Sequence, residues 1–217
     1  MAVPESRVVA LPEDDDGALA DAAAERLQPW ADRLAAVLVG PGLADGDRTV
    51  SLVVRLLEVF GAVPVVLDAA AMEAVRALPQ RDAPVLVTPH AGEMAQLTGL
   101  AKEQVRRDPA AAALGAARRW GAGVALKGPQ TVVATPAGAL WRHDGRGLVG
   151  LATSGSGDVL AGLVAGLAAR GAPLEQAAVW GVALHARAGA ALAQRMGSLG
   201  YLARELAAEV PRLMDRS

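Results

Sequence analysis

The chain alternates short, uniformly apolar runs with longer segments in which apolar residues recur every three or four positions. The uniformly apolar runs have the length and composition of buried strands; they are Arg7–Leu11, Ala36–Val39, Pro64–Asp68 and Pro84–Val87. The periodic segments predict helices; they are Asp21–Gln28, Arg48–Phe60, Ala70–Ala77, Ala91–Leu97 and a helix from the Asp108-Pro109 start signal to Trp120. This alternation predicts a parallel sheet covered by helices on both faces.

The pattern changes after Trp120. Short apolar runs then follow one another directly, which is typical of antiparallel hairpins; they are Val124–Lys127, Thr131–Ala134 and Gly138–Trp141. The rest of the chain has helical periodicity over Asp158–Arg170, Leu174–Met196 and Tyr201–Met214. We therefore expect an α/β protein whose central sheet is mostly parallel and ends in an antiparallel hairpin region.

Composition narrows the class of protein. With 217 residues, 53% of them hydrophobic, the chain is expected to form a single domain over residues 1–217. A formal net charge of −2 gives no basic excess of the kind that nucleic-acid partners require, and no basic amphipathic helix suggests a membrane surface. The absence of cysteine excludes disulfides and thiolate metal sites and fits a cytoplasmic location, and residues 1–16 lack a signal-peptide pattern.

Glycine and polar residues gather directly after the predicted strands. In open α/β sheets, ligands bind outside the carboxyl ends of the parallel strands. The candidates in these places are Gly40–Gly42, Asp68, Thr88–His90 with Glu93, Lys127–Thr131 and Gly155–Asp158. We expect these segments to converge at one edge of the sheet.

The segment Gly155-Ser156-Gly157-Asp158 leads into an apolar helix. Its glycines permit a sharp turn, and the start of the helix offers free N–H groups and a positive dipole end to an anion such as phosphate. Asp158 places a carboxylate beside that anion, which indicates phosphoryl chemistry with Asp158 as the base. The alternative is a plain loop followed by an acidic first helical turn.

Other candidates also have a structural alternative. His90 and Glu93 could be a turn residue and a first-turn acid, although together they place a donor and a carboxylate near one helix start. Lys127 could be a solvated strand end, or could hold a phosphate as a point charge. His185 is predicted to be a core or cavity-wall histidine, and His143 receives no role.

Several familiar sites are excluded because their motifs are missing. The chain contains neither a G-x-x-x-x-G-K-[ST] phosphate loop nor a G-x-S-x-G nucleophile turn. Gly155, Gly157 and Gly162 do not have G-x-G-x-x-G spacing, and the histidines do not have zinc-ligand spacing.

Three ordered motifs carry a resemblance to a known family. Thr88–Glu93 matches T-P-H-x-G-E, Lys127–Thr131 matches K-G-x-x-T, and Ala152–Gly162 matches A-T-x-G-S-G-D-V-L-A-G. The chain resembles the ADP-dependent NAD(P)H-hydrate dehydratases of the ribokinase-like superfamily, with similarity from about Arg7 to Met196. The resemblance implies a ribokinase-like three-layer α/β/α sandwich. It also implies ADP-dependent dehydration of (6S)-NADHX or NADPHX to NADH or NADPH, with AMP and phosphate as by-products.

The resemblance also implies residue roles, partners and cofactors. Asp158 would be the catalytic base and contact the substrate, while Gly42 and His90 would contact the hydrated dinucleotide. Glu93 would help to organise Mg²⁺ through water. ADP would be the co-substrate, and copies of the chain would form a homo-oligomer, a tetramer by family likeness. The nucleotide would be held by Lys127, Gly128, Pro129, Gln130, Thr131, Gly155 and Gly157.

The sequence departs from the family pattern in two places. The family's upstream strand, glycine-rich turn and helix have no counterpart, so we expect an N-terminally shortened domain in which Arg7–Leu11 is the strand that follows that segment. The family's D-A-D-x-L stretch is Asp68–Met72 here, with Ala70 in place of the second acid. A ribokinase-like small-molecule kinase and a non-catalytic nucleotide-binding homologue remain open as alternative functions.

Overall fold

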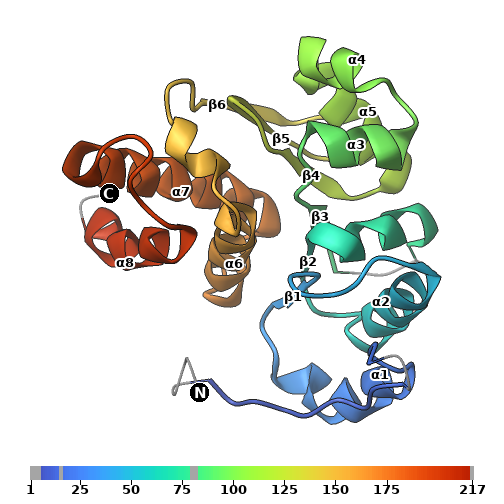
Figure 1. The fold of residues 1–217 in the computed structure, drawn as a ribbon. Helices are drawn as coiled ribbons and strands as arrows, with labels where there is room; N and C mark the ends of the chain where they lie inside the picture. Colours follow the sequence, from blue (N-terminus) through green and yellow to red (C-terminus); the bar gives the residue numbers. More distant parts are fainter. Residues whose placement is uncertain (1–5, 15–16, 79–82, 216–217) are drawn as a thin grey trace.

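The computed structural model describes residues 6–14, 17–78 and 83–215. Its strands form one sheet whose spatial order follows the chain (Figure 1). They are β1 (Val37–Val39), β2 (Val65–Leu67), β3 (Val85–Val87), β4 (Gly123–Leu126), β5 (Gln130–Ala134) and β6 (Leu140–Asp144). Strands β1 to β4 run parallel, and β5 and β6 are antiparallel to their neighbours. The predicted parallel sheet with an antiparallel hairpin region is confirmed.

Helices cover both faces of the sheet and give a three-layer α/β/α sandwich (Figure 1). One face carries α1 (Ala22–Leu27), η1 (Gln28–Arg33), α2 (Asp47–Val59), η2 (Ala69–Ala77), α3 (Ala91–Thr98), α4 (Lys102–Arg107) and α5 (Pro109–Trp120). The other face carries α6 (Ser156–Ala169) and α7 (Leu174–Met196), preceded by the short η3 (Val149–Ala152). Helix α8 (Ala203–Met214) packs against α7 and α6.

Successive residues of each buried strand point to opposite cores. In β2, Val65 and Leu67 face the core under α2 and α5, whereas Val66 faces the core under α6 and α7. Each of these side chains is 0% exposed. Burial on both faces explains why the strands read as uniformly apolar runs rather than as alternating ones.

The predicted strand at Arg7–Leu11 is wrong. The segment pairs with no strand, and Val8 is 67% exposed. An apolar run becomes a strand only where a sheet edge offers hydrogen bonds and a face to bury. Here the segment instead brings the Arg7 guanidinium over the Trp30 ring, 4.1 Å from its centroid.

Smaller differences concern element type and position. The third hairpin strand is β6 rather than Gly138–Trp141, because Gly138 adopts a φ of +95° in the turn and its N–H donates to the Thr135 carbonyl. The predicted helix at Ala70–Ala77 is the 3-10 helix η2. The short elements α4 and η3 were not predicted at all.

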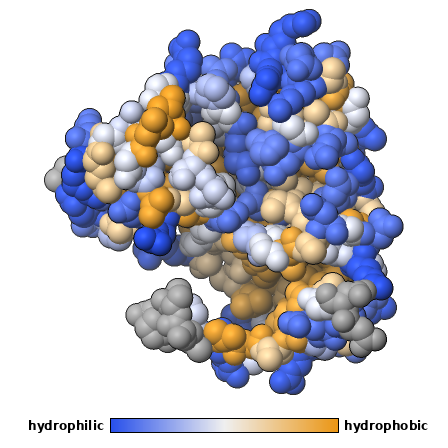
Figure 2. Space-filling model, viewed as in Figure 1, coloured by the Kyte–Doolittle hydropathy of each residue, from blue (hydrophilic) through white to orange (hydrophobic). Residues whose placement is uncertain are grey.

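Hydrophobic surface is unevenly distributed on the face shown in Figure 2. Orange areas lie beside the N-terminal segment and over the connection between β6 and α6, where Val149 is 56% exposed (Figure 2). In the described part of the chain, no helix combines the length and the apolar composition that crossing a membrane requires. The cytoplasmic location stays a prediction.

Gly40 lets the end of β1 approach β2 closely. Its φ is +134°, and a Cβ at this position would lie 1.8 Å from the Asp68 carbonyl oxygen. We expect Gly40→Ala to lower the free energy of unfolding by about 1–3 kcal/mol in urea denaturation, because the strands must separate to admit the methyl group.

Gly46→Ala is the matched control for this prediction. Gly46 has a similar φ of +140°, but a Cβ there would meet nothing within 4 Å. The control therefore carries the backbone strain without the collision. Equal losses of stability in the two variants would contradict the close-approach explanation.

Candidate active site

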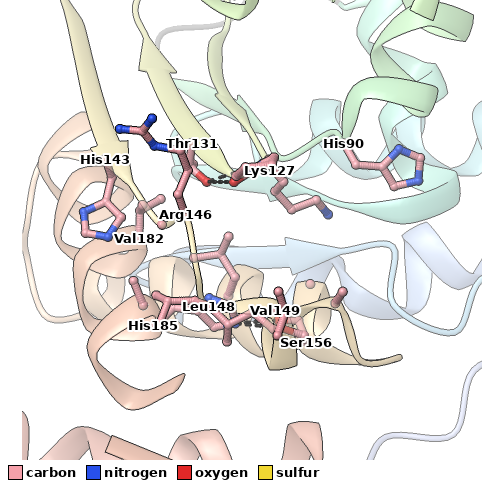
Figure 3. Close-up of a pocket in the computed structure, with 18 of the residues that line it drawn as sticks. His90, Lys127, Thr131, His143, Arg146, Leu148, Val149, Ser156, Val182 and His185 are labelled. Carbon is pink, nitrogen blue, oxygen red and sulfur yellow. Dashed lines mark hydrogen bonds between the residues drawn. The ribbon is translucent and has the colours of Figure 1, made fainter. Parts of the chain in front are cut away.

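A cavity of about 630 Å³ lies at the carboxyl ends of the parallel strands, between the sheet and helices α6 and α7 (Figure 3). Figure 3 shows Lys127, Thr131 and His90 on the sheet side and Ser156 and His185 on the helix side. The cavity therefore brings together three segments that the sequence analysis named, since His90, Lys127 to Pro129 with Thr131, and Gly157 all line it.

The first turn of α6 forms one wall of the cavity. Gly155 caps the helix in the left-handed region with a φ of +82°, and no side chain caps the helix N-terminus. A Cβ on Gly157 would lie 3.0 Å from the Lys127 Nζ atom, so the ammonium group rests against the first helical turn. Uncapped N–H groups, the helix dipole and this cation together make a site suited to an anion.

Asp158 lies in the first turn of α6. It follows Gly157 directly, but its side chain is exposed and it is not among the residues that line the cavity wall. The structure therefore does not bring the predicted base into the cavity lining, and its role remains a prediction.

A buried carboxylate, that of Asp68, accepts a hydrogen bond from the Lys127 ammonium. Asp68 is 2% exposed, and its Oδ1 atom accepts hydrogen bonds from the Thr88 hydroxyl at 2.6 Å and from the Lys127 ammonium at 3.0 Å. The sequence analysis listed Asp68 only by its place after a strand. Its pairing with Lys127 joins residues 59 positions apart, which no local pattern encodes.

His90 and Glu93 form the N-terminal cap of α3. His90 Nδ1 accepts from the backbone N–H groups of Gly92 and Glu93 at 3.0 and 3.1 Å, and Glu93 Oε2 accepts from the His90 N–H at 2.7 Å. These two residues therefore do act as the turn residue and the first-turn acid of a helix start. His90 also lies between the main cavity and a second hollow of about 340 Å³, which Glu93 lines.

Some predicted contact residues lie outside these two spaces. Gly42 is exposed and lines neither, although its neighbour Leu43 lines the second hollow. Gln130 and Gly155 flank the main cavity without lining it. Their predicted contacts remain predictions.

The residues present suit only a water-mediated role toward a metal ion. Among the described residues, no three His, Asp or Glu side chains gather into a metal site. One Glu93 oxygen is committed to the α3 cap, and the other lies 3.6 Å from His90 Nε2. Direct ligation would compete with the cap, whereas Mg²⁺ readily keeps waters between itself and a carboxylate.

His185 is buried in α7 and lines the cavity wall, as predicted. Its Nε2 atom lies 3.0 Å from both the carbonyl oxygen and the hydroxyl of Ser156. A carbonyl oxygen only accepts, so Nε2 carries the proton. Burial lowers the pKa of His185 to about 4, the hydrogen bond to Ser156 opposes this shift, and the charge of Lys127 adds to it.

Two cavity residues were missed by the sequence analysis. His143 pairs with Thr131 across β5 and β6, so both belong to one side of the hairpin, a fact that depends on the strand register. Arg146 follows in the next turn, where its guanidinium donates to Asp144 at 2.6 Å and lowers the pKa of that carboxyl to about 2. The sequence shows the Asp144-Gly145 turn signal, but the expected strand Gly138–Trp141 ends before it, whereas β6 extends to Asp144 and leads directly into this turn.

The fold and the site together define a class of protein. Parallel strands that turn antiparallel after β4, with helices on both faces, are those of a ribokinase-like α/β fold. The chain belongs to the NAD(P)H-hydrate dehydratase family, whose model matches residues 4–212.

Relatives agree with this assignment. An ADP-dependent (S)-NAD(P)H-hydrate dehydratase from Xanthomonas campestris is 44% identical over 100% of this chain and 73% of that protein. A bifunctional NAD(P)H-hydrate repair enzyme from Moorella thermoacetica is 39% identical over 99% of this chain and 41% of that protein. The ADP/ATP-dependent NAD(P)H-hydrate dehydratase of Bacillus subtilis, crystallised with ATP and Mg²⁺, has a TM-score of 0.75 at 33% identity. That match covers 83% of this chain and 64% of the Bacillus chain, so the chain spans less than two thirds of these last two proteins.

The depressed pKa of His185 predicts a stability that depends on pH. The unfolded chain binds the imidazole proton near pH 6.5, whereas the folded chain resists it down to about pH 4. We expect the stabilisation to be complete above pH 6.5 and to be lost as the pH falls toward 4, by about 3 kcal/mol in the free energy of unfolding.

Urea denaturation between pH 7 and pH 4 measures this loss. His185→Gln should flatten the pH dependence, because the amide keeps a donor for Ser156 and does not titrate. Ser156→Ala keeps the imidazole and the backbone carbonyl, so this variant should retain the pH dependence of stability. An unchanged slope in His185→Gln would show that other groups cause the loss.

Proposed function

We propose that this chain removes water from hydrated NADH or NADPH at the expense of ADP. The main supporting observation is that the Lys127 ammonium and the uncapped N-terminus of α6 meet at one cavity, and that Asp158 lies in the first turn of the same helix. Family membership and the names of the relatives support the reaction and the substrate class.

Phosphoryl transfer requires positioning and charge stabilisation more than covalent help from the protein. The terminal phosphoryl group of ADP sits against the first turn of α6, where N–H groups and Lys127 stabilise its negative charge. Asp158 takes the proton of the substrate ring hydroxyl as that oxygen bonds to phosphorus, and AMP leaves. Phosphate then leaves with the electrons of the C–O bond. The neighbouring ring carbon loses a proton to solvent, and the ring double bond that forms restores the reduced nicotinamide.

The nucleotide occupies the main cavity. Lys127 to Thr131 form a tight turn at its edge, where the Thr131 hydroxyl donates to the Gly128 carbonyl at 3.2 Å. Apolar side chains such as Leu148, Leu160 and Val182 line the inner wall and suit a flat adenine base. Gln130, Gly155 and Gly157 complete the nucleotide contacts of this proposal.

The hydrated dinucleotide extends from the main cavity into the second hollow. His90 lines both spaces, and its exposed imidazole, whose Nδ1 is engaged in the α3 cap and whose Nε2 lies 3.6 Å from Glu93 Oε1, contacts the ligand where the two spaces meet. Gly42, one residue before the Leu43 wall of that hollow, contacts the same ligand.

Glu93 would help to hold Mg²⁺ through a water molecule. A bound Mg²⁺ would neutralise charge on the phosphate oxygens. The protein's own part is to keep Glu93 in place through its hydrogen bond with the His90 N–H.

Copies of the chain form a homo-oligomer, for which a tetramer is the proposed size. Exposed apolar side chains such as Trp180 (51% exposed) and Leu199 (77% exposed) support association. Light scattering should give a mass of several chains. A single-chain mass at micromolar concentration would reject this.

The activity is tested with purified protein, hydrated NADH and ADP, by following the appearance of reduced nicotinamide and AMP. Phosphorylation of small alcohols without loss of hydrate would identify a small-molecule kinase. Binding of ADP in calorimetry without turnover of either kind would identify a nucleotide-binding homologue.

Asp158→Asn is expected to reduce turnover by roughly 10²- to 10⁴-fold, because the amide cannot accept the proton. Calorimetry should still detect ADP, since the helix terminus and Lys127 are untouched. Asp47→Asn is the matched control, an exposed acid in the first turn of α2 outside the cavity. Equal turnover of Asp158→Asn and the control would refute the assigned role.

A further inference from the structure

We propose that Asp68 is a positioning residue that fixes the Lys127 ammonium against the first turn of α6. The inference rests on the proposed function, because it assigns Lys127 to the phosphoryl group of the nucleotide. Asp68 does not line the main cavity and therefore acts through the lysine.

The geometry of the pair supports a fixed arrangement. The Asp68 side chain is 3% exposed and that of Lys127 is 20% exposed, with 3.0 Å between Oδ1 and Nζ. The same oxygen accepts the Thr88 hydroxyl at 2.6 Å, so the carboxylate is held from the neighbouring strand as well. A lysine side chain has a flexible four-carbon stem, and this buried charge selects one of its many conformers.

The backbone around Asp68 is held equally firmly. The Asp68 N–H donates to the Val39 carbonyl at 3.0 Å, and Gly40 packs against the Asp68 carbonyl. The next residue, Ala69, has a φ of +48°, which is an unfavourable conformation for alanine. The end of β1 thus holds the Asp68 backbone, while the residues after β3 and β4 bond its carboxylate.

The buried charge of Asp68 determines where the Lys127 ammonium lies. A carboxylate as buried as Asp68 is costly without a cation, and Lys127 supplies that cation. On the other side of the ammonium, Gly157 leaves room because it has no Cβ. The ammonium therefore lies between the carboxylate and the helix terminus before any nucleotide arrives, which removes a reorganisation step from phosphoryl transfer.

This arrangement predicts that Asp68→Asn reduces turnover without weakening the binding of ADP. Asp68→Asn removes a negative charge near the anion site, so ADP binding in calorimetry should be no weaker than in the wild type. The lysine loses its fixed position, so kcat should fall by about 10²-fold. A residue that served only stability would not separate these two quantities.

A double-mutant cycle tests whether Asp68 acts through the lysine. In a Lys127→Met background, Asp68→Asn should lower kcat no further, because there is no ammonium left to position. This double variant leaves no unpaired buried charge, and the comparison does not depend on the folding of Asp68→Asn alone. An additional 10²-fold loss in that background would overturn the proposal.

Glu209→Gln provides the matched control. Glu209 is another buried carboxylate, paired with Arg195 at 2.7 Å in the α7–α8 packing, away from the cavity. Its neutralisation should lower stability and leave kcat and ADP binding unchanged. An equal fall of kcat in this variant would reduce the Asp68 effect to general destabilisation and overturn the proposal.

Crystals with ADP separate this inference from the proposed function. If the wild type binds ADP but does not convert the hydrate, the proposed function fails, while the position of Nζ can still be compared. We expect Nζ at the first turn of α6 in the wild type and displaced from it in Asp68→Asn. The same Nζ position in both crystals would overturn the positioning role.

Discussion

A single buried charge organises the functional edge of this protein. Asp68 is removed from water at the end of β2, and the structure tolerates its carboxylate because Thr88 and Lys127 supply hydrogen bonds from the next strands. The parallel register makes this possible, since it brings strand ends from distant parts of the chain to one edge. The carboxylate holds the lysine, and the lysine ammonium in turn lies against the first turn of α6.

Helix α6 supplies the second half of the site through its backbone. Gly155 turns the chain into the helix, and Gly157 admits the lysine ammonium. Directly behind this turn, His185 donates to the Ser156 carbonyl and is neutral because burial disfavours its protonated form. His185 thus adds no cation to the cavity wall. The cations of that wall are the Lys127 ammonium, which lies against the helix terminus, and the Arg146 guanidinium, which is paired with Asp144.

Ala70, which stands in place of the family's second acid, lies among other acidic residues. Ala70 lines the second hollow, whose wall already includes the acidic residues Asp45, Glu73 and Glu93. A fourth acid there would add repulsion in a partly buried space. The alanine therefore changes the charge of the space next to His90 and leaves the lysine and the helix terminus as they are.

The sequence by itself determined the order of strands and helices, the change from parallel to antiparallel pairing, and the segments that meet at the strand ends. These follow from local periodicity and from glycine, proline and capping signals, which act over a few residues. Only the tertiary structure decided that Arg7–Leu11 lacks a strand partner, that His143 faces Thr131, and that Asp68 holds Lys127. The reason is physical: register, burial and ion pairing across 59 residues depend on which surfaces meet, and no local pattern of side chains specifies that.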